Sequence, residues 1–145
     1  MPSEAVNKKT RQEWRQLGYF YDRGDDVKEW RIVGSVAGLR KFARLVQIYA
    51  SDPRSIQMSE HDHFGPYGYL TVGTWNVPLI DKHWIAGPLS DLLRLCVLVN
   101  ERIVAARVGE TLKFREAYAP ASPYELVLEV RDDAFDPASA DTGCW

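Results

Sequence analysis

The chain has 145 residues, of which 46% are hydrophobic and 26% charged, and its formal net charge is -2. This length and composition are typical of one globular domain with its own core, and the nearly balanced charge argues against a general nucleic-acid-binding protein, which usually carries a basic patch. The N-terminus lacks the apolar core of a signal peptide, and no apolar run is long enough to span a bilayer. We therefore expect a cytoplasmic protein with neither a membrane nor a nucleic acid as partner.

The first part of the chain predicts a lead-in followed by a β-hairpin. Residues 1–12 are polar and basic, and we expect them to form a flexible N-terminal lead-in. Residues 14–21 are rich in aromatic side chains, and residues 27–33 alternate apolar with charged side chains, which is typical of two strands. Gly and Asp residues between 22 and 26 favour a tight turn that joins them.

Two amphipathic helices are predicted by apolar residues that recur at helical spacing. The first covers about residues 36–50, with Ser35 as its N-cap, and the second runs from about 88 to 108. Cys96 lies on the apolar stripe of the second helix, whereas Cys144 is next to last in the chain. We expect one buried thiol and one tail thiol instead of a disulfide framework, which favours a reducing compartment.

The remaining segments complete a single α+β domain over residues 13–131, followed by an irregular acidic C-terminal tail at 132–145. Alternating or β-branched residues predict further strands at 69–75, 80–85, 111–116 and 124–130. The element order is then β-β-α-β-(β)-α-β-β. This order predicts a mostly antiparallel sheet of five or six strands with two helices packed on one face.

The run Glu60-His61-Asp62-His63-Phe64-Gly65-Pro66-Tyr67 holds two of the three histidines of the chain. In an extended segment His61 and His63 point the same way, and His83 is then a possible third metal ligand. The chain has no spaced ligand motif of a known metal site, so we expect no cofactor and keep this ligand set as an alternative. Glu60 and Asp62 offer a second alternative, an acid/base enzyme built on the same loop.

A recognition surface is a further interpretation of the same region, since Tyr, Trp and Arg dominate interface hot spots. Aromatic residues exceed the obvious needs of a small core, and the surplus comprises Tyr19, Tyr21, Phe64, Tyr67, Tyr69, Trp75 and Trp84. Phe64 and Tyr67 flank the histidines and are the better surface candidates. Asp25 and Asp26 in the predicted turn are candidates for mimicry of an acidic ligand, although a turn is also the ordinary place for Asp.

Three segments of the chain carry a resemblance to a known family. They are E-W-R-I-V-G-S-V-A-G-L, S-E-H-D-H-F-G-P-Y-G-Y-L-T-V-G-T-W and H-W-I-A-G-P-L-S-D-L. With them, residues 14–130 resemble the bacterial immunity proteins of polymorphic toxin systems, most closely immunity protein family 32.

The resemblance implies a small α+β protein that is not an enzyme and that neutralises a cognate toxin domain by covering its active site. It supplies no contact residues. The candidates for partner binding therefore come from this sequence alone, and they are His61, Asp62, His63, Phe64, Tyr67, Asp25 and Asp26. An enzyme or a small-ligand binding module remains the alternative.

Overall fold

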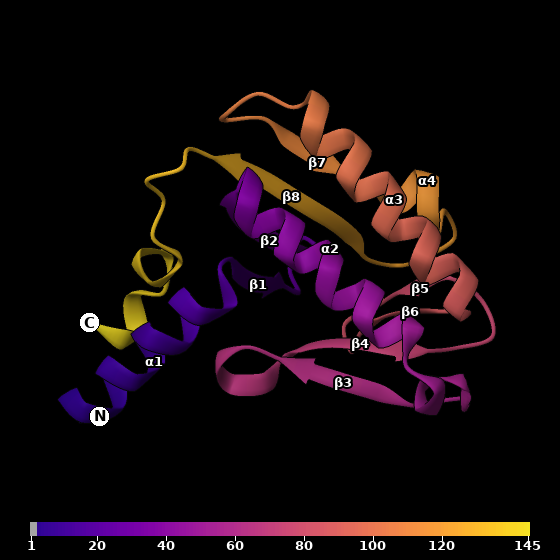
Figure 1. Ribbon diagram of the computed structural model, residues 1–145, viewed down its shortest axis with the longest axis horizontal. Helices are drawn as coiled ribbons and strands as arrows, with labels where there is room; N and C mark the ends of the chain where they lie inside the picture. The colour runs from indigo at the N-terminus through magenta and orange to yellow at the C-terminus, as the bar shows by residue number, and fades with distance from the viewer. Residues whose placement is uncertain (1–2) are drawn as a thin grey trace.

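The computed structural model describes residues 3–145, which fold around two mixed four-stranded sheets (Figure 1). In spatial order, the first sheet contains β1 (Phe20–Gly24), β2 (Glu29–Ser35), β8 (Glu125–Arg131) and β7 (Thr111–Lys113). The second contains β3 (His61–Phe64), β4 (Leu70–Thr74), β6 (Ile85–Gly87) and β5 (Leu79–Ile80). In each sheet the central pair, β2 with β8 or β4 with β6, is parallel, and the outer strands are antiparallel to it.

Four α-helices accompany the sheets, together with short 3₁₀ turns. They are α1 (Glu4–Leu17), α2 (Val36–Ser51), α3 (Leu89–Ala105) and the single turn α4 (Arg115–Tyr118). The 3₁₀ turns are η1 (Pro53–Ile56), η2 (Pro66–Gly68), η3 (Pro137–Ala140) and η4 (Thr142–Cys144). The helices α2 and α3 lie side by side, with α2 packed on β2 and β8 and α3 on β6 (Figure 1). Both sheets therefore share one pair of covering helices.

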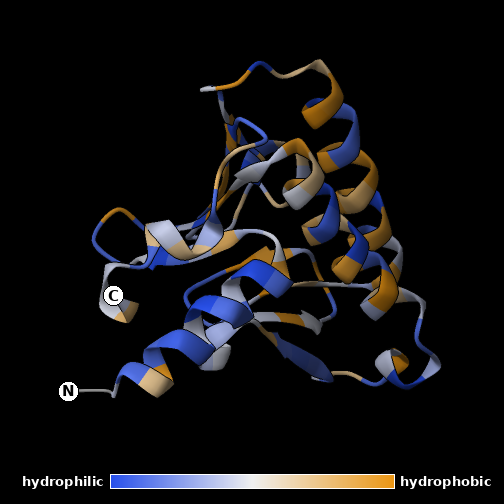
Figure 2. Cartoon of the chain, turned by 60° about the vertical axis from the view of Figure 1, so that its left-hand side comes forward, coloured by the Kyte–Doolittle hydropathy of each residue, from blue (hydrophilic) through white to orange (hydrophobic). Residues whose placement is uncertain are grey.

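The helices α2 and α3 form where their sequence pattern predicts them. Ser35 accepts the backbone N–H of Gly38 at 3.1 Å, which confirms it as the N-cap of α2. Gly38 is needed for close contact, because a Cβ built there would lie 2.2 Å from the carbonyl oxygen of Gly18. Apolar residues of α2 and α3 face the core while charged residues alternate with them along the outer sides (Figure 2).

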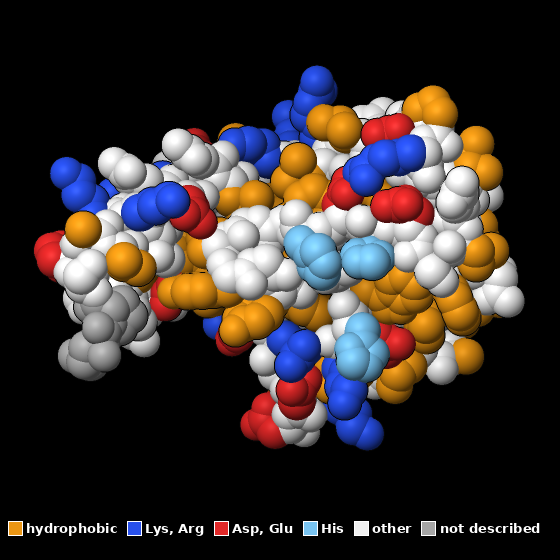
Figure 3. All heavy atoms as spheres, turned by 90° about the horizontal axis from the view of Figure 1, so that it is seen from below, with side chains coloured by type: hydrophobic (Ala, Val, Ile, Leu, Met, Phe, Trp, Pro, Cys, Tyr) orange, Lys and Arg blue, Asp and Glu red, His pale blue; other side chains and the backbone are white. Residues whose placement is uncertain are grey.

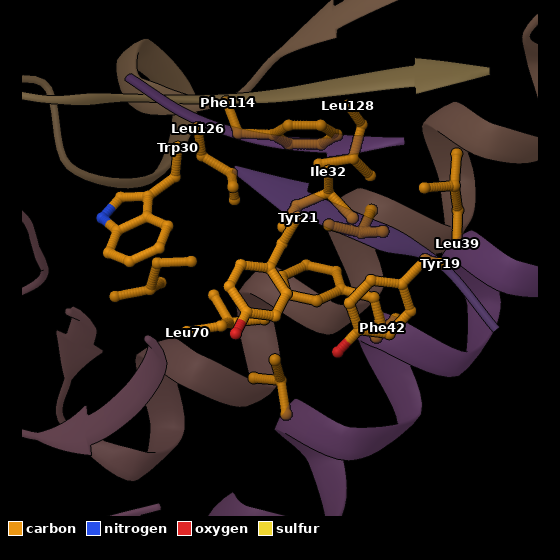
Figure 4. Packing of buried hydrophobic residues seen from close by; sticks show 14 of the residues in the cluster. Tyr19, Tyr21, Trp30, Ile32, Leu39, Phe42, Leu70, Phe114, Leu126 and Leu128 are labelled. Atoms are coloured by element: carbon orange, nitrogen blue, oxygen red, sulfur yellow. The ribbon is translucent and has the colours of Figure 1, made fainter. Parts of the chain in front are cut away.

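One hydrophobic core joins the two sheets and the helices. Figure 4 shows Tyr19 and Tyr21 from the β1 segment facing Phe42 of α2 and Leu70 of β4. Trp30 completes this core from β2 and has no exposed surface. Because side chains from both sheets meet in it, the two sheets form a single packed unit.

The predicted fold class, α+β, is confirmed, but the prediction of one mostly antiparallel sheet is wrong. Residues 61–64 form a strand in the second sheet. The segment around 80–85 supplies two short strands, β5 and β6, and not one. These short strands carry weak local signals, and in the first sheet the central pair joins Glu29 of β2 to Glu125 of β8, far away in sequence, so the sheet arrangement depends on tertiary contacts.

The N-terminal prediction is also wrong, because α1 occupies residues expected to be a lead-in and the start of a strand. Ser3 caps this helix by accepting the N–H of Val6 at 3.2 Å, and Gly18 ends it with φ of 91°. Figure 2 shows α1 as largely hydrophilic, and Trp14 is its one buried residue. Because α1 buries only Trp14, most of its residues are polar or charged, and its sequence resembles a flexible segment.

The C-terminal tail contains η3 and η4 and lies along α1 (Figure 1). An ion pair of 3.0 Å joins Arg15 to Asp136. Cys96 is buried on α3 as predicted, and the tail thiol of Cys144 is buried as well; both cysteines are free. Across residues 3–145, the structure has no helix both long enough and apolar enough to cross a bilayer.

Candidate functional site

The hairpin of β3 and β4 presents the paired histidines. His61 lies opposite Gly73 and His63 opposite Thr71 in the antiparallel register. Because side chains alternate along a strand, both imidazoles project from the same face, as predicted, and both are exposed. Asp62 and Phe64 project from the other face.

All three histidines of the chain line one open groove of about 550 Å³ (Figure 3). We call it the histidine groove, and its lining comprises Ser59, His61, His63, Thr71, Trp75, Leu79, Asp81, His83 and Trp84. The rings of His61 and His63 meet edge to face with centroids 5.1 Å apart. Figure 3 shows hydrophobic surface beside the histidines, and the groove includes a tilted pair of indoles, Trp75 and Trp84, with centroids 5.7 Å apart.

Hydrogen bonds define which imidazole nitrogen faces outward. Nδ1 of His61 lies 2.9 Å from the carbonyl oxygen of Ser59, and Nδ1 of His63 lies 3.0 Å from that of Gly68. A carbonyl oxygen only accepts, so a proton on Nδ1 satisfies both contacts. Nδ1 of His63 also lies 3.0 Å from Oγ1 of Thr71, an oxygen that the same N–H reaches. In the neutral rings Nε2 is then an acceptor that is left for a partner.

The loop that carries His83 is held by Asp81, whose Oδ1 accepts the backbone N–H groups of His83 at 2.8 Å and Trp84 at 3.2 Å. Trp84 covers Gly73 directly, because a Cβ built at Gly73 would lie 2.2 Å from Cε3 of the indole. The absence of a side chain at Gly73 is thus what lets Trp84 lie flat against β4.

His61, His63 and His83 share the lining of the groove, but the structure does not gather them into a close ligand set. Nowhere in residues 3–145 do three or more His, Cys, Asp or Glu side chains gather closely enough to hold a metal ion. The two hairpin imidazoles already engage Nδ1 with backbone carbonyls.

The carboxylates of the loop do not join the histidines. Arg54 binds Asp62, and its Nη1 lies 3.4 Å from Oε1 of Glu60. A hydrogen bond to Asp62 and another to Asp52 raise the pKa of the Arg54 guanidinium. Because Glu60 and Asp62 lie on the face of β3 opposite to the imidazoles, the structure does not bring together an acid/base pair of these groups.

None of the other sequence candidates lines the groove. Phe64 is half-buried against the core, whereas Tyr67 is exposed. Asp25 accepts the hydroxyl of Tyr124 at 2.7 Å, which lowers the pKa of the Asp25 carboxyl, and Asp26 is exposed. Arg23 joins this turn to the groove, since it pairs with Asp25 at 2.8 Å and donates to the carbonyl of Lys82, next to His83, at 2.8 Å.

A second pocket, with a volume of about 430 Å³, lies beside the turn that joins β3 to β4. We call it the tyrosine pocket, and its lining comprises Trp14, Phe20, Tyr21, Asp22, Arg23, Tyr67, Tyr69 and Asp141. The two sites are neighbours, because His63 of the groove bonds to Gly68, which lies between Tyr67 and Tyr69. Sequence reasoning missed Asp141 because only the fold brings the tail to this hairpin.

The chain has no match among protein-family models, curated proteins or solved structures. The resemblance to immunity proteins therefore stays a prediction, and the geometry of the groove carries the functional argument.

Proposed function

We propose that this chain is a cytoplasmic immunity protein that binds a cognate toxin domain through the histidine groove and neutralises it by occlusion. The observation that carries the proposal is the convergence of three histidines and two tryptophans from separate segments on one open groove. Exposed imidazoles beside half-buried indoles offer hydrogen bonds and apolar area together, the combination found at interface hot spots.

The groove is supported by a buried polar network behind the hairpin. The hydroxyl of Tyr49 in α2 donates to the carbonyl of Glu60 at 2.6 Å and lies 2.6 Å from Oγ1 of Thr74. Thr74 in turn donates to the carbonyl of Ser55 at 2.6 Å. These bonds tie η1, β3 and β4 to α2, so the recognition surface is ordered before a partner arrives. A preformed surface loses less conformational entropy on binding.

The partner chemistry follows from the groove lining. In the neutral form of His61 and His63, Nε2 accepts a hydrogen bond, and the indoles of Trp75 and Trp84 offer apolar area to a partner. The groove therefore fits a toxin surface with donor groups set among apolar residues. Occlusion requires no bond-making step by this protein, and the proposal assigns it no catalytic residue.

The test is co-expression with the toxin domain encoded directly upstream of the gene, followed by calorimetric titration of the purified pair. We expect the wild-type protein to restore growth. The variant Trp84→Ala should weaken binding by about 2 kcal/mol or more, as for a hot-spot residue. Arg44→Ala, on the exposed side of α2, is the matched control and should bind like the wild type.

Two negative results have different meanings. If the wild-type protein neither binds nor protects against that toxin domain, the immunity function is wrong. If the wild-type protein protects and Trp84→Ala, His61→Ala and His63→Ala protect equally well, the function stands and the histidine groove is not the binding surface.

A further inference from the structure

The tyrosine pocket has a chemistry of its own. We propose that it is a binding site for an alkylated ammonium group, with aromatic walls around the cation and Asp141 as its counter-ion. The site goes beyond the proposed toxin neutralisation and does not depend on it.

The walls of the pocket are an aromatic cluster around Trp14. The Trp14 ring lies 4.9 Å from that of Phe20, 5.0 Å from that of Tyr21 and 6.4 Å from that of Tyr67, measured between centroids. The side chains of Trp14, Phe20 and Tyr21 are buried. Those of Tyr67 and Tyr69 are more than half exposed, and their stacked rings have centroids 5.9 Å apart. The pocket thus has a buried aromatic floor and an exposed aromatic rim. Aromatic faces attract cations through their quadrupole.

Asp141 supplies an unneutralised negative charge. Its Oδ2 accepts the indole N–H of Trp14 at 2.9 Å and the hydroxyl of Tyr67 at 2.7 Å, and its Oδ1 accepts the N–H of Gly143 at 3.0 Å. Burial opposes ionisation, but these donated bonds outweigh it and lower the pKa of the Asp141 carboxyl. All three donors are neutral, and no Lys or Arg side chain in residues 3–145 forms an ion pair with it.

The other charged side chains that line the pocket, Asp22 and Arg23, do not neutralise the charge of Asp141. Arg23 is already engaged, because it pairs with Asp25 and donates to the carbonyl of Lys82. Asp22 is exposed, and its one ion pair within the described chain, with Arg31, is long at 3.9 Å.

The hydrogen bonds of Asp141 also decide which cation fits. A carboxylate has about four lone-pair sites, and three are already used here. A guanidinium group, which gains most from a two-pronged bond to a carboxylate, has little to bind. An alkylated ammonium group does not donate a pair of parallel hydrogen bonds. It is attracted instead by the negative charge and the aromatic faces that the pocket supplies.

Tertiary contacts hold Tyr67, part of the pocket rim, in a backbone conformation that a tyrosine rarely adopts. Tyr67 has φ of 68° and ψ of -15°, a left-handed conformation that is rare for a bulky residue. Tertiary bonds hold the turn: Tyr21 donates its hydroxyl to the carbonyl of Pro66 and accepts the N–H of Tyr69 at 3.2 Å. Strained residues of this kind cluster at ligand sites.

The experiment is an NMR titration of ¹⁵N-labelled full-length protein with tetramethylammonium chloride at constant total chloride. The indole N–H signal of Trp14, assigned with Trp14→Phe, reports on the site because that group binds Asp141. We expect a saturable shift with a dissociation constant of about 1 mM, since each contact of the cation with an aromatic ring or with the carboxylate raises the affinity by roughly tenfold or less. Tert-butanol, a neutral probe of similar size, should give no saturable shift.

Variants distinguish the effect of the Asp141 charge on binding from an effect on folding. Asp141→Asn keeps an acceptor for Trp14 and should bind tetramethylammonium about tenfold more weakly. Tyr69→Ala removes an exposed wall and should also weaken binding, while Asp136→Asn, in the same tail but outside the pocket, should not change it. Butylguanidinium should bind more weakly than tetramethylammonium. An unchanged amide spectrum outside the pocket verifies that each variant is folded.

A fourth probe identifies the source of the cation. If N-acetyl-trimethyllysine amide binds tenfold more tightly than tetramethylammonium, the natural ligand is a methylated lysine side chain, and equal binding points to a free methylated amine. The proposal is overturned if the Trp14 signal does not saturate by 100 mM tetramethylammonium, if tert-butanol binds equally, or if Asp141→Asn binds with unchanged affinity.

Discussion

Replacing Gly73 with alanine should displace Trp84 from the floor of the histidine groove. The new Cβ would lie 2.2 Å from Cε3 and 2.4 Å from Cζ3 of the indole. Carbon atoms in contact are about 3.5 Å apart, so the ring must move by roughly 1.3 Å. Since Trp84 is half-buried and follows a loop, it can swing outward, but it then loses its contact with Trp75.

The magnitude follows from two opposing effects. Overpacking of this kind costs about 1–3 kcal/mol. The lower chain entropy of unfolded alanine recovers about 0.4–1 kcal/mol. We expect Gly73→Ala to reduce the free energy of unfolding by about 1–2 kcal/mol, which corresponds to a fall in melting temperature of roughly 2–8 °C for a chain of this size. Urea unfolding followed by far-ultraviolet circular dichroism measures it without relying on tryptophan fluorescence.

A double-mutant cycle tests the physical reason. In the Trp84→Ala background the ring is gone, so Gly73→Ala should cost less than in the wild type by about 1 kcal/mol or more. The carbonyl oxygen of Glu60, 3.1 Å from the new Cβ, accounts for any residual cost. If Gly73→Ala is equally destabilising in both backgrounds, the close contact with Trp84 is not the cause and the geometry given for the groove floor is wrong.

Three further predictions concern the supports of the two sites. Tyr49→Phe removes the hydroxyl bonded to Glu60 and Thr74 and should lower the free energy of unfolding by about 1–2 kcal/mol in urea, because it leaves a buried carbonyl without its donor; unchanged stability would contradict this. Tyr67→Gly should be more stable than Tyr67→Ala by about 1 kcal/mol, since only glycine accepts φ of 68° without strain, and equal midpoints would rule out backbone strain. Folding lowers the pKa of Asp141, so the ionised carboxylate stabilises the fold above the unfolded pKa of about 4, and this stabilisation is lost as pH falls through the folded pKa. In urea unfolding at decreasing pH, the free energy of unfolding should therefore fall less steeply for Asp141→Asn than for the wild type, and parallel curves would count against this role.

Local pattern was sufficient for the parts of the fold whose burial repeats along one segment. The buried residues of α2 and α3 recur three or four positions apart, and that period is visible in the sequence. The shared direction of His61 and His63 follows equally from the two-residue period of a strand. By contrast, α1 buries Trp14 alone, so its charged sequence resembles a flexible segment.

The sequence by itself determined the fold class, the two long helices, the N-cap at Ser35 and the common face of the hairpin histidines, because each depends on side chains a few residues apart. Only the tertiary structure decided that eight strands form two mixed sheets, that His83 and Trp84 complete the histidine groove, and that Asp141 reaches Trp14. These arrangements join residues far apart in the chain, 127 positions in the case of Trp14 and Asp141. Their free energy comes from burial and hydrogen bonding summed over the whole core, and no local period encodes that sum.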